Sequence, residues 1–152
     1  MARIAVTTHV EAPPSRVFAV LTAWEAHPSW RRGVRSVRLR SEQREGVGTA
    51  LRCRTEVVAG IAIDDDLVVT AWQPERVVAV RHTARLVRGV GAIELTPTRH
   101  GTRVDWWEEL DLPLWAVGEA IGTLLVVPWL SRRHRASLAG LKRVCESDSV
   151  RP

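Results

Sequence analysis

Several residue types are scarce or missing in this chain of 152 residues. There is no tyrosine, only one phenylalanine and only two cysteines. The cysteines, Cys53 and Cys145, show neither the paired spacing of a disulfide framework nor the spacing of metal ligands. We therefore expect two reduced thiols, no metal site and no cofactor.

Long apolar runs are also missing. The first twelve residues, MARIAVTTHVEA, alternate and turn polar early, unlike the apolar core of a signal peptide. The longest apolar stretch, residues 117–130, contains Glu119, two glycines and Pro128. It is shorter than the roughly 20 residues that a membrane-spanning helix needs. These absences predict a cytoplasmic protein without a membrane span.

Linkers, repeats and low-complexity tracts are absent as well. With 45% hydrophobic residues, the chain has enough apolar surface for one core. We expect residues 1–152 to form a single domain.

Basic charge is plentiful and almost entirely arginine. The formal net charge is +5, and clusters occur at Arg31–Arg32 and over residues 132–135. A basic surface can hold nucleic acid, but no recognition-helix or RNA-binding motif accompanies the charge. Nucleic acid is therefore an unlikely partner, and an acidic protein partner is favoured over it.

Alternation and turn residues predict the secondary structure. Pro13–Pro14 ends a first strand and precedes a short helix, and a second short helix or turn follows it. Two strands surround the glycines at 46 and 48, and a meander of four long strands then leads to a helix opened by Pro113. The expected ranges are 3–12 (strand), 15–22 and 25–30 (short helices), 61–72, 76–84, 86–97 and 102–111 (strands), and 113–146 (helix). This order predicts an α+β fold in which one helix covers one face of an antiparallel sheet.

The segment RGVGAIEL places Gly89 and Gly91 on one face of a strand. If Pro97 pairs with Thr102 across the following turn, Gly91 falls opposite Glu108 and Gly89 opposite Leu110. On the other side, His82 falls beside Gly89 and Val80 beside Gly91. The glycines would then form a floor about 10 Å wide between His82 and Glu108.

A second hairpin predicts which face is buried. If Trp72 pairs with Val77, then Val69 pairs with Val80 and Leu67 with His82. Asp64 would meet Arg85 on the opposite face, which marks that face as solvent-exposed. His82 therefore points inward, and Asp65 lies diagonal to it.

Two explanations remain open for the missing bulk. Glycines let a bent sheet curl and let a helix sit close, and Gly118 and Gly122 repeat the omission on the covering helix. Alternatively, the glycines keep a cavity open for a guest molecule.

Four segments carry a resemblance to a known superfamily. They are VEAPPSRVFAVLTAWEAHPSW (10–30), GVGTALRCRT (46–55), LTPTRHGTRVDWWEELDLP (95–113) and PWLSRRHRASLAGLKRVCE (128–146). In this order, the chain resembles the START-like, or SRPBCC, superfamily and its polyketide cyclase/dehydrase-like members. The resemblance implies a helix-grip fold, in which a seven-stranded antiparallel sheet wraps around a long C-terminal helix with an apolar cavity between them. It favours the cavity explanation and brings no fixed catalytic motif.

The expected cavity lining combines apolar, aromatic and polar residues. As ligand-binding residues we predict Cys53, Val80, Gly89, Gly91, Ile93, Trp106, Ile121, Leu125, Trp129 and Arg132. The candidate catalytic residues are His82, Glu108 and Asp65. His82 beside a carboxylate could act as a general base, and a buried Glu108 with a raised pKa could protonate a leaving hydroxyl. Alternatively, His82 and Asp65 only satisfy one another, Glu108 pairs with an arginine such as Arg52, or these groups anchor a ligand without chemistry.

Three classes of function follow from this reading. The first is a carrier or sensor of a hydrophobic, cyclic or polyketide-like small molecule. The second is a polyketide cyclase or dehydratase, to which an acidic acyl-carrier protein could deliver substrate at the arginine-rich rim. The third is a regulatory protein that uses its basic surface. The apolar segment 117–130 also suggests a homodimer contact.

Overall fold

The computed structural model describes residues 2–112 and 118–147 of the chain, and its elements follow the predicted order. The proposed start of the last helix at Pro113 lies outside the described residues. The elements are β1 (Ala2–Val10), α1 (Pro14–Thr22), the 3₁₀ helix η1 (Trp24–Ser29), β2 (Val34–Leu39), β3 (Ala50–Val58), β4 (Ile61–Gln73), β5 (Val77–Thr83), β6 (Arg88–Thr98), β7 (Gly101–Asp111) and α2 (Glu119–Ser147).

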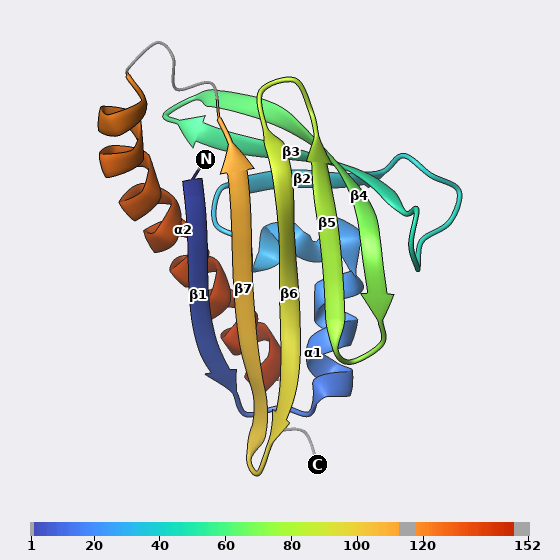
Figure 1. The fold of residues 1–152 in the computed structure, drawn as a ribbon. Helices are drawn as coiled ribbons and strands as arrows, with labels where there is room; N and C mark the ends of the chain where they lie inside the picture. The colour runs from blue at the N-terminus through green and yellow to red at the C-terminus, as the bar shows by residue number, and fades with distance from the viewer. Residues whose placement is uncertain (1, 113–117, 148–152) are drawn as a thin grey trace.

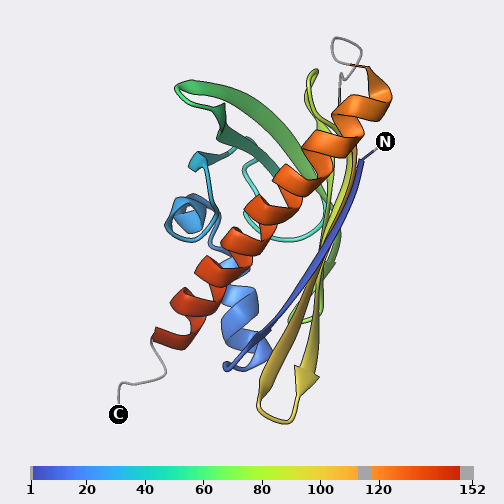
Figure 2. The same ribbon diagram turned by 90° about the vertical axis from the view of Figure 1, so that its left-hand side faces the viewer.

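The strands form one antiparallel sheet in the order β1-β7-β6-β5-β4-β3-β2. The sheet is strongly curved, and α2 runs diagonally across its concave side (Figures 1 and 2). The short helices α1 and η1 lie on the same side as α2 (Figure 2). The predicted helix-grip fold is thus confirmed.

The register agrees with the prediction around the glycine floor. Gly91 pairs with Val80 and Glu108, and Gly89 pairs with His82 and Leu110. These pairings could be predicted because two tight turns fix the strand ends and side chains alternate between the faces.

The β4–β5 turn differs from the prediction by one residue. Trp72 pairs with Val78 and not with Val77, and a bulge between Val69 and Ala71 restores the predicted pairing of Val69 with Val80. The pairing of β4 with β5 ends at Leu67 and His82, and β5 ends at Thr83, so the predicted Asp64–Arg85 pair is wrong. Asp64 instead forms an ion pair of 3.2 Å with Arg54 of β3. The conclusion drawn from that pair still holds, because Asp64 is exposed and Asp65 faces inward.

Two apolar clusters hold α2 and the short helices to the sheet. The C-terminal half of α2 contributes Leu138, Leu141 and Cys145 to a cluster with β1 and β7. Trp24 of η1 packs in the other cluster, against β2 to β5. Close approach is achieved at Gly140, where a Cβ would lie 2.4 Å from the Trp30 carbonyl oxygen. The helix therefore touches the η1 segment directly at this end of the molecule.

The structure indicates why β6 carries glycines at positions 89 and 91, for which the sequence allowed two explanations. Gly89 has φ +140°, and a Cβ there would lie 2.0 Å from the Glu109 carbonyl oxygen. A Cβ at Gly91 would lie 2.8 Å from Glu108 Cγ. Gly89 is therefore required by the backbone of β7, whereas a side chain at Gly91 would first displace Glu108.

The N-terminal half of α2 presents apolar side chains to solvent. Ile121, Leu124 and Leu125 are 56%, 74% and 66% exposed. No helix among the described residues combines the length and apolar character needed to cross a bilayer. A homodimer contact through this surface stays a prediction.

Candidate active site

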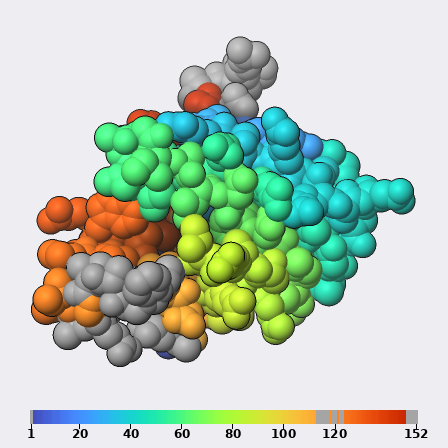
Figure 3. Space-filling view, turned by 90° about the horizontal axis from the view of Figure 1, so that it is seen from above, coloured from blue at the N-terminus to red at the C-terminus, as the bar shows by residue number. Residues whose placement is uncertain are grey.

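Two small chambers lie between the sheet and the helices, and they share a wall. The first has a volume of about 60 Å³ and the second about 140 Å³. From above, the surface is hollowed between the start of α2, the β3–β4 hairpin and the β5–β6 turn (Figure 3), where the second chamber has many of its lining residues. The residues that line both chambers are Arg31, His82, Trp106 and Glu108.

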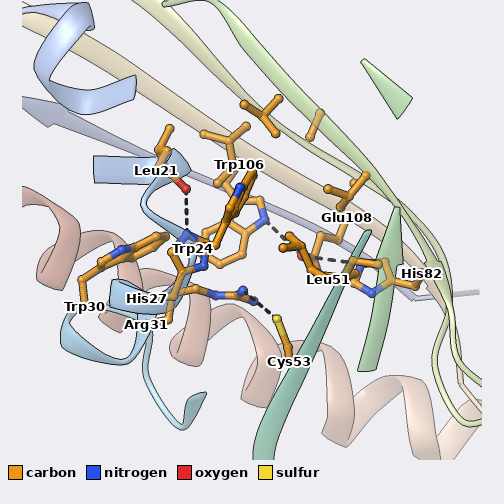
Figure 4. Close-up of a pocket in the computed structure, with 16 residues that line it drawn as sticks. Leu21, Trp24, His27, Trp30, Arg31, Leu51, Cys53, His82, Trp106 and Glu108 are labelled. Atoms are coloured by element: carbon orange, nitrogen blue, oxygen red, sulfur yellow. Dashed lines mark hydrogen bonds and ion pairs between the residues drawn. The ribbon is translucent and has the colours of Figure 1, made fainter. Parts of the chain in front are cut away.

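Most of the first chamber is apolar and aromatic (Figure 4). Its lining comes from α1, η1 and strands β3 to β7: Leu21, Trp24, His27, Trp30, Arg31, Leu51, Cys53, Leu67, Val78, Val80, His82, Gly91, Ala92, Ile93, Trp106 and Glu108. The second chamber is lined by Arg31, Arg32, Val34, Thr55, Val57, Ile63, Asp65, His82, Val87, Trp106, Glu108, Leu110, Leu112, Trp129, Leu130, Arg133, His134 and Ser137. The shared wall therefore carries the predicted catalytic histidine and glutamate.

His82 and Asp65 form the predicted pair. Both point inward from neighbouring strands, and His82 Nδ1 lies 2.8 Å from Asp65 Oδ2. Because a carboxylate accepts hydrogen bonds, Nδ1 carries a hydrogen and donates a hydrogen bond to Asp65. His82 Nε2 is buried without a hydrogen-bond partner among the described residues, and lies 4.0 Å from Glu108 Oε1. The described residues therefore leave this ring nitrogen without a hydrogen bond.

Glu108 is held by two neighbours and not by the arginine proposed for it. Its Oε1 accepts a hydrogen bond of 3.1 Å from Trp106 Nε1, and its Oε2 lies 3.1 Å from His134 Nε2. Arg52 instead pairs with Asp66 on the outer face at 2.8 Å. The carboxylate is thus fixed between the sheet and α2.

His134 approaches Glu108 from α2 through its ring nitrogen Nε2. His134 Nδ1 lies 2.8 Å from the Leu130 carbonyl oxygen, which can only accept, so Nδ1 carries a hydrogen. A neutral ring would then turn a lone pair on Nε2 toward the Glu108 carboxylate. The contact is favourable when Nε2 is also protonated, which makes it an ion pair between an imidazolium and a carboxylate.

The predicted raised pKa of Glu108 is wrong. Burial, the largest influence, raises the pKa, but the contact with His134 and the charges of His134, His82 and Arg31 outweigh it and lower the pKa of Glu108 to about 2. Glu108 is therefore ionised at neutral pH and is not the acid that protonates a leaving hydroxyl.

His82 is the better proton-transfer group. Burial lowers its pKa, but the hydrogen bond to Asp65 and the charges of Asp65 and Glu108 give a net raised pKa. As a neutral ring it can remove a proton through Nε2, and as an imidazolium it can return one. The role of His82 as a base stays a prediction, and the lowered pKa of Glu108 disagrees with the role of acid predicted for it.

Two polar lining residues were missed by the sequence reasoning. His27 of η1 is 6% exposed and donates through Nε2 to the Leu21 carbonyl at 2.6 Å. Arg31, treated only as surface charge, has its guanidinium 5.6 Å from the centre of the Trp106 ring and donates to Cys53 Sγ at 3.7 Å. The signal was their place next to Trp24 and Trp30, which line the same chamber.

The predicted ligand-binding residues divide between lining and surface. Cys53, Val80, Gly91, Ile93 and Trp106 line the first chamber, and Trp129 lines the second. The remaining four, Gly89, Ile121, Leu125 and Arg132, are not among the described residues that line either chamber.

Arg132 belongs instead to a shallow groove outside the second chamber. This outer groove, of about 480 Å³, lies between the end of β3 and α2 and shares Arg32, Val57, Trp129 and Arg133 with the second chamber. The exposure of Ile121 and Leu125 shows that this part of α2 turns these residues away from the cavity side.

Metal-type clusters are not found in the part of the chain that the structure describes. The chemistry that the described site supports is proton transfer between His82 and a bound molecule, in surroundings that are mainly apolar.

Comparison with solved structures shows where the fold recurs. TTHA0849 from Thermus thermophilus superimposes with a TM-score of 0.81 at 20% identity, covering 97% of this chain and 99% of that one. The di-domain ARO/CYC StfQ from the steffimycin biosynthetic pathway has a TM-score of 0.78 at 17% identity, covering 97% of this chain and 51% of that one. The di-domain ARO/CYC BexL from the BE-7585A biosynthetic pathway gives 0.78 at 20% identity, covering 99% and 50%. At such identities the likeness shows the shared fold.

No curated protein matches this chain. A family model does, over residues 1–146, and it describes polyketide cyclases or dehydrases and lipid transport proteins. The match spans the sheet, both short helices and almost all of α2. This chain therefore belongs to the polyketide cyclase/dehydrase and lipid transport family.

Proposed function

We propose that this protein binds a small, mainly apolar cyclic ketone and moves a proton on it through His82. The observation that supports this most is the position of His82 Nε2. It is buried, has no hydrogen-bond partner among the described residues, and lies in the wall that both chambers share. A nitrogen in that position can reach a guest in either chamber.

The chambers suggest the size of the guest. An apolar protein cavity of about 150 Å³ accommodates one benzene ring. The second chamber, at about 140 Å³, is of this size, and the first, at about 60 Å³, has room for a substituent. The tryptophans of the lining offer flat apolar faces to such a ring. A guest with one ring therefore matches the volume of the second chamber.

The reaction would begin with neutral His82. Nε2 removes a proton from the carbon next to the guest's carbonyl, and Asp65 stabilises the imidazolium that forms. The resulting enolate carbon attacks a second carbonyl of the same molecule, which closes a ring and leaves an alkoxide. The imidazolium returns its proton to that oxygen. Loss of water then requires a second proton removal and protonation of the departing hydroxyl, and it needs no oxidant.

The family and two structural neighbours support this reading. The family description includes cyclases and dehydrases, and StfQ and BexL are described as ARO/CYC proteins of biosynthetic pathways. Carriage without chemistry is the second candidate, because the same family description includes lipid transport and the first chamber is mostly apolar.

Proton exchange on acetophenone separates the two candidates without knowledge of the natural guest. We expect the wild type to bind acetophenone and to speed exchange of its methyl protons with D₂O by roughly 10²-fold, which is in the range of general base catalysis. His82→Gln should bring the rate close to that of buffer, and Asp65→Asn should give an intermediate rate. The rates are read by proton NMR.

His100→Gln is the matched control, because His100 is an exposed histidine in the β6–β7 turn. It should exchange acetophenone at the wild-type rate. Binding with exchange at the buffer rate in the wild type would establish a carrier. Failure of acetophenone to bind at all would contradict both candidates for guests of this size.

A further inference from the structure

Arg133 lies at the outer end of the second chamber, where several contacts hold its guanidinium. Its Nε donates to the Arg32 carbonyl at 3.0 Å, and its guanidinium lies 5.2 Å from the centre of the Trp129 ring. A Cβ at Gly33 would lie 1.8 Å from Arg133 Nη2, so the guanidinium fills the space that a side chain there would take. Gly33 has φ +79°, a conformation that favours glycine. The position of Arg133 is therefore set by its surroundings.

One nitrogen of this guanidinium has no hydrogen-bond acceptor among the described residues. Arg133 Nη2 is buried and has no hydrogen-bond partner within residues 2–112 and 118–147. A buried donor without a partner is unfavourable, and more so when it is charged. Such a group is expected to meet an acceptor that the protein itself does not supply.

Arg31 brings a second positive charge to the same chamber. Its guanidinium donates to Cys53 Sγ and lies over the Trp106 ring, and its charge also helps to lower the pKa of Glu108. Burial, followed by the charge of Arg31, lowers the pKa of Arg133. Two like charges facing one chamber are mutually unfavourable until an anion lies between them.

Each nearby carboxylate has at least one partner, while Asp65 Oδ1 is buried without a hydrogen bond among the described residues. Asp65 accepts from His82, Glu108 is held by Trp106 and His134, and Glu56 forms an ion pair with Arg35. The second chamber therefore has an excess of positive donors at its outer end, next to the outer groove.

Building on the proposed function, we infer that the guest carries an anionic oxygen group, either a carboxylate or a phosphate monoester, that binds between Arg133 and Arg31. The apolar part of the guest then lies in the second chamber, with its reactive carbon toward His82. A planar guanidinium fork suits both anions, because each can accept two parallel hydrogen bonds.

Matched probes test this inference. 3-Phenylpropionate, 2-phenylethyl phosphate and 3-phenylpropan-1-ol share a phenyl ring and differ in charge and head group. We expect both anions to bind the wild type at least tenfold more tightly than the alcohol, by calorimetry at low salt. Arg133→Gln should weaken binding of the preferred anion at least tenfold and leave binding of the alcohol within twofold.

Two further variants keep the result interpretable. Arg135→Gln makes the same charge change on an exposed residue of α2, and it should leave all three affinities within twofold of the wild type. Arg133→Lys keeps the charge without the fork, and should retain part of the preference. Each variant is first checked for a cooperative thermal transition.

The two proposals fail in different ways. If the alcohol binds as tightly as the anions, or if Arg133→Gln and Arg135→Gln act alike, the anion site is wrong while the apolar chamber stands. If none of the three probes binds, the guest class proposed for the chamber is wrong as well. A preference for the phosphate over the carboxylate, or the reverse, identifies the head group.

Discussion

Two buried histidines face the first chamber from opposite sides, and their surroundings differ. His27 comes from η1 and His82 from β5, and each is 6% exposed (Figure 4). His27 packs edge-on against Trp24 and Trp30, with ring centres 5.5 and 5.0 Å away. His82 instead has Asp65 at 2.8 Å and Glu108 at 4.0 Å.

The pKa of each ring follows from these neighbours. Burial, with a smaller contribution from the charge of Arg31, lowers the pKa of His27 to about 3. For His82, burial acts in the same direction, but the two carboxylates more than compensate and the net pKa is raised. At equal burial, the pKa of His27 is therefore lowered and that of His82 is raised.

The largest effect on stability is expected when the buried carboxylate of Glu108, near His82, is removed. Glu108→Ala leaves the Trp106 N–H without its acceptor, and His134 Nε2 without the carboxylate 3.1 Å away. Removing one partner of a buried ion pair costs about 3–5 kcal/mol. We expect a loss of this size in the free energy of unfolding, measured by urea denaturation at pH 7.

Glu109→Ala is the control, because the neighbouring glutamate forms a surface ion pair with Arg3 at 3.0 Å. Surface pairs contribute about 0–1 kcal/mol. Equal losses of unfolding free energy in Glu108→Ala and Glu109→Ala would show that Glu108 is not a buried ion-pair partner.

A pair of glutamine substitutions tests the opposite behaviour of the two histidines. His27 does not bind a proton in the folded state until about pH 3, whereas the unfolded chain binds one near pH 6.5. It therefore lowers stability by about 1.4 kcal/mol for each pH unit below 6.5. His27→Gln removes this penalty, so its free energy of unfolding should gain on that of the wild type as the pH falls from 6.5 to 4.

His82 should show the reverse trend. Its raised pKa gives stability that is complete below the unfolded value and is lost as the pH rises through the folded one. The stability deficit of His82→Gln should therefore be larger at pH 5.5 than at pH 9. If the free energies of unfolding of His27→Gln and His82→Gln change with pH in the same way, the two histidines do not have opposite pKa shifts. Urea denaturation across this pH range measures both.

The sheet side of this comparison could be read from the sequence, and the helix side could not. Strand alternation and two tight turns place His82, Gly91 and Glu108 together, because a register fixed at a turn carries along the strands. The one-residue difference at Trp72 did not matter, since a bulge corrected it before Val80. Contacts within one sheet were therefore predictable.

Contacts between layers depend on how helices dock, which no local pattern encodes. The predicted pKa of Glu108 had the wrong sign because His134, its partner on α2, was not foreseen. Ile121 and Leu125 were assigned to the lining from their helical spacing alone, and both are exposed. His27 and Arg31 were missed for the same reason, since η1 positions them only once it packs over the sheet.

The smallest effect is expected at the glycine floor. A Cβ in Gly91→Ala would lie 2.8 Å from Glu108 Cγ and 3.1 Å from the Trp107 carbonyl oxygen, so Glu108 has to shift. Overpacking of this kind typically costs 1–3 kcal/mol, and the lower conformational freedom of alanine in the unfolded chain offsets part of it. We expect a net loss of about 1 kcal/mol in the free energy of unfolding.

A double-mutant cycle shows whether this cost runs through Glu108. In the Glu108→Ala background Cγ is gone, so Gly91→Ala should cost less there, with a coupling of at least about 0.5 kcal/mol. Additive losses would mean that the backbone, and not Glu108, excludes a side chain at this position. If the coupling is present, the displaced carboxylate should also lower the pKa of His82 in Gly91→Ala, measured by NMR titration, because the charge of Glu108 helps to raise it. The pKa values of His27 and His82 would then differ less. The missing side chain at Gly91 would thus contribute to the difference between the two pKa values.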